Sequence, residues 1–399
     1  MPRRMNSVML IALMCLCEVL TTLDVFAFAS LLPHFGQLWA LDSVDMGWIS
    51  GIFFAGYTVA VPVLVALTDR IDARPIYIGG ALVIAVSAAG FALFAEGFWS
   101  ALAFRFFAGA GFAGTYMPGL RVLLDRYAGP HRGRAVAVYT GFFSFGVAAS
   151  YLTAGEVMQL FGWRMVFWTT MGAAAGAAVL IWLLLRPVTP ARTEHTGHLL
   201  DFRPVLRNRE VMGYVLCYGV HAWELLGLRA WIVAFLAYSQ TGGGGITPTQ
   251  AAAIGALFAV FASIAGGELA TRFGRRRVIA LIMAVSAVIA AGIGFGATLS
   301  YGWVIVFTLV YIVFVQGESA ALTTGTVQAA PPGLQGATLA VHSICGFTGG
   351  FLGPLVFGIV LGLGGAAADF WGYAFASLGA VVALGPLFLL IFGRRQGAT

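Results

Sequence analysis

The chain has 399 residues, of which 60% are hydrophobic and only 10% are charged. An ordinary soluble domain carries charge on about a quarter of its residues, so this composition excludes that class and indicates a membrane protein with many spans. The formal net charge is +6, and every basic residue is Arg. No catalytic triad, nucleotide-binding loop or Cys/His metal spacing stands out, so we expect neither an enzyme nor a bound metal or cofactor.

Twelve apolar segments follow one another along the chain. A hydrocarbon core of about 30 Å requires roughly 20 apolar residues in a helix, so the segments predict an all-α integral membrane protein with twelve transmembrane helices. The basic start of the first segment resembles a signal peptide, but its length and the acidic residues Glu18 and Asp24 predict a retained helix. The predicted spans are 6–32, 46–67, 76–96, 99–124, 135–158, 164–186, 210–238, 250–270, 277–298, 301–325, 337–362 and 371–392.

The arginines fall almost entirely in alternate loops, and the loops of the other side hold essentially only Arg164. By the positive-inside rule, the arginine-rich side and both termini are cytoplasmic. We therefore expect a multi-pass protein of the bacterial inner membrane, and the net charge gives no reason to expect nucleic-acid binding. The loop arginines are Arg3, Arg4, Arg70, Arg74, Arg126, Arg132, Arg134, the group between Arg186 and Arg209, Arg272, Arg275 to Arg277, Arg394 and Arg395.

The chain repeats itself at an offset of about 202 residues. The loop VALTDRIDARP after the second span matches GELATRFGRRR after the eighth, so that Asp69 and Thr271 occupy equivalent places. The glycines of the fifth span match those of the eleventh in the same register. This repetition predicts two parallel six-helix halves, residues 1–186 and 210–399, joined by a polar, proline-containing cytoplasmic linker at 187–209. The sequence TPTQ at 247–250 further predicts a capping-box start for the eighth span.

These loops resemble the signature of the major facilitator superfamily, G-x-L-A-D-R-x-G-R-R between the second and third helices. The resemblance covers essentially the whole chain and implies the twelve-helix fold of that family. The first copy loses its glycines to Val65 and Asp72, and Thr271 replaces the acid of the second. The resemblance implies that the loop residues form a conformational latch that is released when the transporter changes conformation. The alternative is that these charges only set the orientation of the helices in the membrane. The expected latch residues are Asp69, Arg70, Arg74, Gly267, Arg272, Gly274, Arg275 and Arg276.

Two membrane motifs of the family can also be compared with this sequence. The stretch RFFAGAGFAG from Arg105 is similar to the R-x-x-x-G-x-G motif of the fourth helix, whose arginine has been proposed to act in proton transfer. The antiporter motif G-x-x-x-G-P-x-x-x-G is broken in the fifth span, which reads Gly146, Ser150, Tyr151, Gly155 without the proline. This departure weakens a drug-efflux interpretation without excluding it.

The charged residues that we expect to be buried lie on the first, fourth, seventh and tenth predicted spans, which in the similar family line a central cavity. A charge near the bilayer centre costs about 2.5–3.5 kcal/mol on insertion scales, so these residues are functional candidates. A carboxylic acid in a dry site can carry a proton, and the proton-coupling candidates are Asp24, Glu224, Glu18, His221 and Glu318. The alternative is that the acids permanently neutralise Arg105 and Arg229.

The seventh span contains the polar stretch HAWELLGLRAW from His221 to Trp231. His221 and Glu224 are three residues apart, so we expect them to share a face and form one hydrogen-bonded unit. Arg229 lies about 140° around the axis from Glu224, so these two need different partners. Aromatic residues at helical spacing more often serve in packing than in binding. With that alternative open, the candidate substrate-site residues are Arg229, Arg105, Arg121, Trp223, Trp231, Tyr116, Tyr139 and Tyr151.

The leading hypothesis is a proton-coupled secondary active transporter of a small organic solute that works by alternating access. Uptake of an organic anion or metabolite is favoured because of the intramembrane arginines and the broken antiporter motif. Efflux of drugs or organic cations in exchange for protons is the first alternative, and a non-transporting membrane receptor or scaffold is the second. The expected partners are the small-molecule substrate, protons and the lipid bilayer, with no nucleic acid and a monomeric functional unit.

Overall fold

The computed structural model describes residues 6–188, 202–240, 245–331, 334–365 and 367–392. Within these ranges the chain is helical and contains no strand. Among the described residues, ten helices are long and apolar enough to cross a membrane. The predicted all-helical membrane fold is therefore confirmed, whereas the count of twelve spans stays a prediction. Arg3, Arg4, Arg394, Arg395 and most of the predicted linker, 189–201, lie outside the described residues.

The helices follow the predicted spans with three divisions. The first span is divided into α1 (Ser7–Thr22), α2 (Ala27–Ser30) and α3 (Leu32–Leu38), the tenth into α13 (Tyr301–Gly317) and α14 (Ser319–Ala329), and the twelfth into α16 (Asp369–Val382) and α17 (Gly385–Ile391). The others are α4 (Ser43–Leu67), α5 (Ala73–Phe94), α6 (Phe98–Arg126), α7 (Arg132–Phe161), α8 (Trp163–Leu184), α9 (Arg203–Arg207), α10 (Arg209–Ser239), α11 (Pro248–Phe273), α12 (Arg275–Ile293), η1 (Gly294–Gly296) and α15 (Gln335–Gly362).

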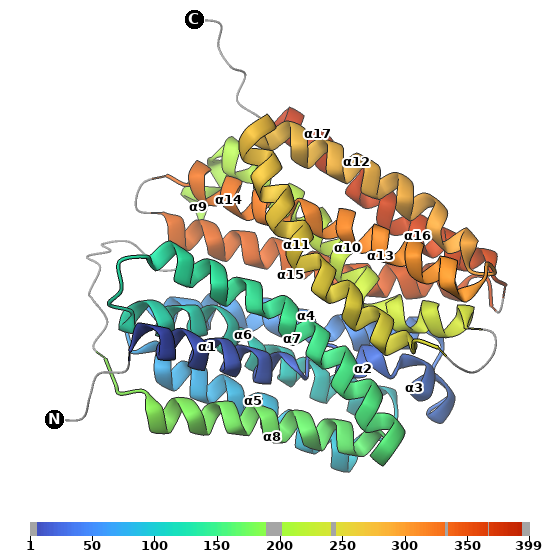
Figure 1. Cartoon of the computed structure of the whole chain (residues 1–399), viewed down its shortest axis with the longest axis horizontal. Helices are drawn as coiled ribbons and strands as arrows, with labels where there is room; N and C mark the ends of the chain where they lie inside the picture. The colour runs from blue at the N-terminus through green and yellow to red at the C-terminus, as the bar shows by residue number, and fades with distance from the viewer. Residues whose placement is uncertain (1–5, 189–201, 241–244, 332–333, 366, 393–399) are drawn as a thin grey trace, which may run out of the picture. The chain divides into compact units, whose positions relative to one another are not determined.

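The described residues form two compact units, one from Met1–Leu31 and Gly56–Thr196 and the other from Leu32–Ala55 and Gly197–Thr399. In the first unit, α5 packs against α6 and α8, and α1 packs against α7; the long helices lie side by side (Figure 1). In the second unit, α10 packs most extensively against α15. The segment 32–55 groups with the second unit, so the two units do not coincide with the predicted halves, 1–186 and 210–399. The division into two six-helix halves stays a prediction from the internal repeat.

Glycines bring the principal helices of the second unit into close contact. A Cβ atom at Gly353 on α15 would meet the backbone of Trp223 on α10, and one at Gly349 would meet Gly219. Small residues permit such backbone approach between membrane helices, where packing replaces the hydrophobic driving force. These glycines of the eleventh predicted span therefore have a packing role against α10.

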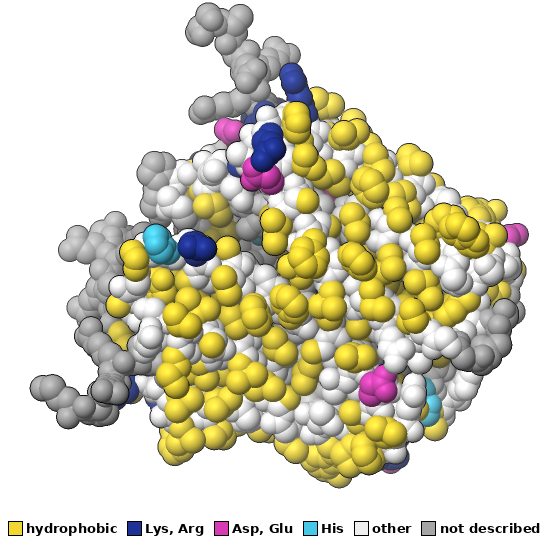
Figure 2. Space-filling model, in the orientation of Figure 1, with side chains coloured by type: hydrophobic (Ala, Val, Ile, Leu, Met, Phe, Trp, Pro, Cys, Tyr) yellow, Lys and Arg dark blue, Asp and Glu magenta, His cyan; other side chains and the backbone are white. Residues whose placement is uncertain are grey.

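The outer surface is largely apolar. In Figure 2 the visible face is covered mainly by hydrophobic side chains, and the few charged ones lie towards its margins. Large hydrophobic residues such as Val86, Phe261 and Val288 are more than two-thirds exposed. A soluble protein rarely exposes so much contiguous apolar surface, so this surface suits contact with lipid.

Candidate functional site

The first predicted membrane helix is interrupted between α1 and α2, at Leu23–Phe26, where the backbone forms a turn. Asp24 lies in this turn and is buried. Its carboxylate Oδ2 lies 2.6 Å from Nη1 of Arg105 on α6, and its Oδ1 accepts a hydrogen bond of 3.0 Å from Thr170 on α8. Asp24 is thus an ion-paired acid inside the first unit.

Arg105 is committed to this turn. Its guanidinium also donates to the carbonyl of Asp24 at 2.9 Å and to that of Val25 at 2.8 Å. The geometry favours the alternative in which Asp24 and Arg105 neutralise each other, because a buried ion pair with further hydrogen bonds is costly to separate. Arg105 contacts backbone and Asp24, so its place as a substrate-binding candidate is weakened.

Glu224 occupies the comparable place in the second unit but has different partners. Its Oε1 accepts hydrogen bonds from Ser286 on α12, at 2.7 Å, and from Tyr311 on α13, at 2.9 Å. Both partners are neutral hydroxyls, and Glu224 Oε2 has no hydrogen-bond partner among the described residues. A proton is therefore the available means of neutralising Glu224, in contrast to Asp24.

The predicted hydrogen-bonded unit of His221 and Glu224 is wrong. His221 Nδ1 instead lies 3.0 Å from Oε1 of Glu318, and both side chains are almost wholly buried. Glu318 is the residue at which α13 ends and α14 begins. Residues three apart on a helix point about 60° apart around its axis, and here that angle directs His221 towards the α13–α14 junction while Glu224 faces α12 and α13.

Arg229 lies near the outer end of the same stretch, and its Nη2 donates to Gln316 Oε1 at 3.0 Å. Arg229 and Glu224 therefore have different partners, as expected, and the partner of Arg229 is on α13. Gln316 is in the last turn of α13 and Glu318 follows that helix directly, so one short segment at the α13–α14 junction supplies the partners of both Arg229 and His221. We refer to His221, Glu318, Arg229 and Gln316 as the α10–α13 polar cluster.

Glu18 is another buried acid, on α1 one turn before the break. It is 1% exposed, and neither oxygen of its carboxyl group has a hydrogen-bond partner among the described residues. Its carbonyl accepts hydrogen bonds from the Thr21 and Thr22 hydroxyls. No described residue forms an ion pair with Glu18, so it resembles Glu224 more than Asp24, and its role in proton coupling stays a prediction.

Most of the candidate aromatic residues are engaged in packing. Trp231 donates from Nε1 to the carbonyl of Pro354 at 2.9 Å and stacks on Phe357. Tyr139 donates to the carbonyl of Tyr116 at 3.0 Å, and Tyr116 stacks on Phe112; Tyr151 stacks on Phe26. Trp223 differs, because it is partly exposed while its Nε1 has no hydrogen-bond partner among the described residues. Trp223 is therefore the aromatic candidate best suited to a substrate.

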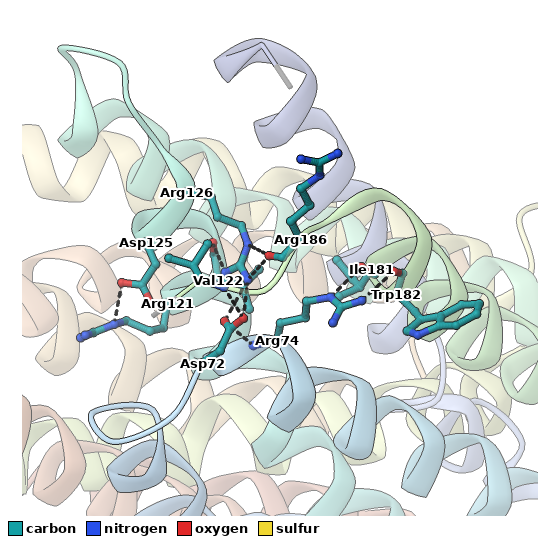
Figure 3. Close-up of polar contacts among 10 residues, drawn as sticks. Asp72, Arg74, Arg121, Val122, Asp125, Arg126, Ile181, Trp182 and Arg186 are labelled. Atoms are coloured by element: carbon teal, nitrogen blue, oxygen red, sulfur yellow. Dashed lines mark hydrogen bonds and ion pairs between the residues drawn. The ribbon is translucent and has the colours of Figure 1, made fainter. Parts of the chain in front are cut away.

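The loop before α5 carries a network of charges within the first unit. Asp72, which stands in the place of a family glycine, binds Nη2 of Arg126 at 2.7 and 2.9 Å and accepts from the backbone of Val188 at 2.9 Å (Figure 3). Arg74 donates to the carbonyls of Ile181 and Trp182 at the end of α8. The network therefore ties the end of α8 to the loop. Sequence reasoning missed both Asp72 and Arg126, although the departure at Asp72 was a visible signal.

Asp69 makes a weaker contact than the family resemblance implies. Its Oδ1 lies 3.4 Å from Nη1 of Arg121, which also pairs with Asp125 at 2.9 Å. The side chains of Arg121 and Asp69 are 31% and 43% exposed, and Arg70 is exposed as well. Arg121 thus interacts with Asp69 of the loop and with Asp125. These contacts do not support the prediction that Arg121 binds substrate.

The second loop copy makes its contacts within the second unit. Arg272 pairs with Glu268, Arg275 Nη1 donates to Gln328 at 2.6 Å, and Arg276 pairs with Glu210 at 3.1 Å. Gly274 has a φ of +91°, a conformation that glycine adopts without strain, and it separates α11 from α12. A Cβ atom at Gly267 would meet the Ala320 side chain only at ordinary contact distance, so this position does not require glycine for space. Whether either loop acts as a latch stays a prediction.

Comparison with known proteins agrees with this architecture. The sequence profile of the Major Facilitator Superfamily matches residues 14–354. Protein spinster homolog 1 of Homo sapiens is 25% identical over 246 residues, 59% of this chain and 47% of that protein, so the match spans about half the length of these relatives. A probable transporter of Streptomyces coelicolor is 28% identical over 94% of this chain and 85% of its own. The 3-(3-hydroxy-phenyl)propionate transporter of Escherichia coli is 25% identical over 97% and 94%.

Solved structures share the same fold. A bacterial homolog of the human lysosomal transporter spinster, in an inward-facing and occupied conformation, superposes with a TM-score of 0.71 at 19% identity, covering 96% of this chain and 94% of that one. A POT family transporter in complex with 5-aminolevulinic acid gives 0.74 at 13% identity, with 97% and 96% covered. The sequence resemblance is confirmed, and the chain belongs to the Major Facilitator Superfamily.

Proposed function

We propose that this protein is a proton-coupled secondary active transporter that takes up a small organic anion by alternating access. The observation that carries the proposal is the α10–α13 polar cluster. In it, the titratable His221 and the cation Arg229 of α10 bind Glu318 and Gln316, which lie two residues apart at the end of α13. A movement of this segment would change the surroundings of the proton-binding pair and of the anion-binding cation together.

Proton coupling is supported by the partners of the buried acids. Glu224 is bound by two neutral hydroxyls, and Glu18 has no hydrogen-bond partner among the described residues. An unpaired charge is expensive within a membrane, so these acids can exchange a proton when their surroundings change. Asp24 is the weakest of the candidates on these grounds, because Arg105 already neutralises it.

An anionic substrate is supported by Arg229, which is buried and which donates to the neutral side chain of Gln316 in the contact described above. The relative from Escherichia coli, which matches nearly the whole chain, is by its name a transporter of an aromatic carboxylate. Arginine suits carboxylate recognition because its planar donors match the two oxygens. Trp223, which is partly exposed and whose Nε1 has no hydrogen-bond partner among the described residues, is the aromatic candidate for contact with such a substrate.

Export of cations or drugs is the second candidate. The buried acids favour it, and a multidrug transporter of Aspergillus fumigatus is 25% identical over 42% of this chain. A non-transporting receptor or scaffold is the third. We further propose that the protein lies in a bacterial inner membrane with both termini in the cytoplasm. Its loops would act as a latch, and its functional unit would be a monomer.

A ligand-stabilisation screen of the purified protein separates these candidates. Aromatic and aliphatic carboxylates, organic cations and neutral isosteres are tested for an increase in the midpoint of thermal unfolding, since a ligand that binds only the folded state raises it. We expect stabilisation by carboxylates that is lost in Arg229→Ala and retained in the exposed control Arg164→Ala. Stabilisation by organic cations that survives Arg229→Ala would instead favour export of cations.

A further inference from the structure

The interruption of the first membrane helix turns backbone carbonyls towards other helices. Within Leu23–Phe26, the amide of Ala27 binds the carbonyl of Asp24, and the amide of Val25 binds that of Thr22, so both bonds reach back three residues instead of four. The carbonyl of Leu23, which in a continuous helix would accept from the amide of Ala27, is thereby released from the helical ladder, and the carbonyl of Val25 accepts from Arg105. In a dry interior such groups require donors from elsewhere in the protein.

Three oxygen atoms of this turn surround one guanidinium group. Arg105 Nη1 lies 2.6 Å from Asp24 Oδ2 and 2.9 Å from the Asp24 carbonyl, and Nη2 lies 2.8 Å from the Val25 carbonyl. Carbonyls of unwound membrane helices, assisted by an acid, also form cation sites in other transporter folds. Here the cation is provided by a side chain of α6.

Ser150 on α7 keeps the turn in this form. Its hydroxyl donates to the carbonyl of Leu23 at 2.6 Å and accepts from the amide of Phe26 at 3.2 Å. These are two groups that an uninterrupted helix would satisfy internally, so the serine takes the place of ladder hydrogen bonds. The oxygens that face Arg105 are therefore held by a contact that does not involve Arg105.

We propose that the turn at Leu23–Phe26 is a built cation-binding site, and that the guanidinium of Arg105 is its resident cation. The site fits a planar cation with diverging donors, because two nitrogens serve oxygens of two different residues. Shortening Arg105 would leave a site that accepts a free guanidinium ion. This inference is independent of the transported substrate and of proton coupling.

The test is chemical rescue of full-length Arg105→Ala in detergent, with the midpoint of thermal unfolding as the readout. We expect a lowered midpoint that low-millimolar guanidinium restores by at least half, well below denaturing concentrations. Urea is the matched additive, since it has a similar planar shape without charge, and sodium chloride controls for ionic strength. Arg164→Ala is the matched variant, because Arg164 is exposed and stacks on Trp163. An equal response to guanidinium and urea would overturn the proposal.

Two further variants sharpen the test, and the first of them keeps it decisive if Arg105→Ala does not fold. Arg105→Lys retains one positive charge but has a single donor centre, so we expect a lowered midpoint that guanidinium does not restore, because the ammonium occupies the site. A midpoint equal to that of the unmodified protein would show that planar donors are not required. In Asp24→Asn combined with Arg105→Ala, the carboxylate is absent, and rescue by guanidinium should be lost.

Discussion

His221 Nδ1 lies 3.0 Å from Glu318 Oε1, and this contact joins α10 to the junction between α13 and α14. The neighbouring acid Glu224 faces α12 and α13 instead, where it accepts hydrogen bonds from the hydroxyl groups of Ser286 and Tyr311. Two titratable positions one turn apart thus have separate partners, so their contributions to transport can be separated by substitution.

Replacement of Glu318 by Gln is expected to uncouple transport from the proton gradient. The amide can still accept a hydrogen bond from His221 but cannot release a proton. Uptake driven by a pH gradient should therefore be lost, while exchange of substrate across the membrane without a gradient continues. Glu268→Gln is the control, because that acid forms an exposed pair with Arg272. Loss of exchange in the same proportion as uptake would contradict a specific coupling role.

The two acids at comparable places should differ in their effect on stability. Asp24→Asn leaves Arg105 without its ion-pair partner, and breaking a buried pair costs about 3–5 kcal/mol. Glu224→Gln keeps an oxygen that can accept from Ser286 and Tyr311, so its cost should be under about 1 kcal/mol. Thermal or denaturant unfolding of the two variants measures the difference. A larger loss in Glu224→Gln than in Asp24→Asn would show that Glu224 is a charged, paired group.

The loop network predicts which ion pair stabilises the first unit. The side chains of Arg126 and Asp72 are 8% and 11% exposed and bind through two short contacts. A double-mutant cycle with Asp72→Asn and Arg126→Gln should give a coupling energy of about 1.5–3 kcal/mol, as for hydrogen bonds between charged groups. The exposed pair Asp69–Arg121 is the matched control and should give under about 1 kcal/mol. Equal coupling in both cycles would argue against the anchoring role of Asp72.

Removal of the Ser150 hydroxyl should loosen the turn in the first membrane helix locally. Ser150→Ala leaves the Leu23 carbonyl and the Phe26 amide without their partner, a loss of about 1–3 kcal/mol for a buried group. Hydrogen exchange should therefore accelerate in residues 22–31 more than in the rest of the chain. Ser239→Ala is the control, since that buried hydroxyl binds a carbonyl of its own helix. Uniform acceleration over the whole first unit would indicate general destabilisation instead.

Features set by local sequence could be predicted, and features set by packing between distant segments could not. The capping box at Thr247 and Gln250 is present as expected, because its partners are three residues apart. The interruption at Leu23–Phe26 contains no Pro or Gly, and its stabilising serine is over a hundred residues away. The partner of His221 depends on where α13 ends, which the apolar pattern of the tenth span does not reveal. Intramembrane charges identified the site residues, but their pairing required the tertiary structure.

Solute-dependent proton movement is the most direct test of the proposed function. The purified protein is reconstituted in liposomes containing a pH indicator, and an organic anion identified by the stabilisation screen is added outside without an imposed gradient. We predict acidification of the lumen with wild-type protein, and loss of that signal in both Arg229→Ala and Glu318→Gln. Uptake of the anion with no movement of protons would contradict proton coupling, and an unchanged signal in Arg229→Ala would contradict the assigned anion site.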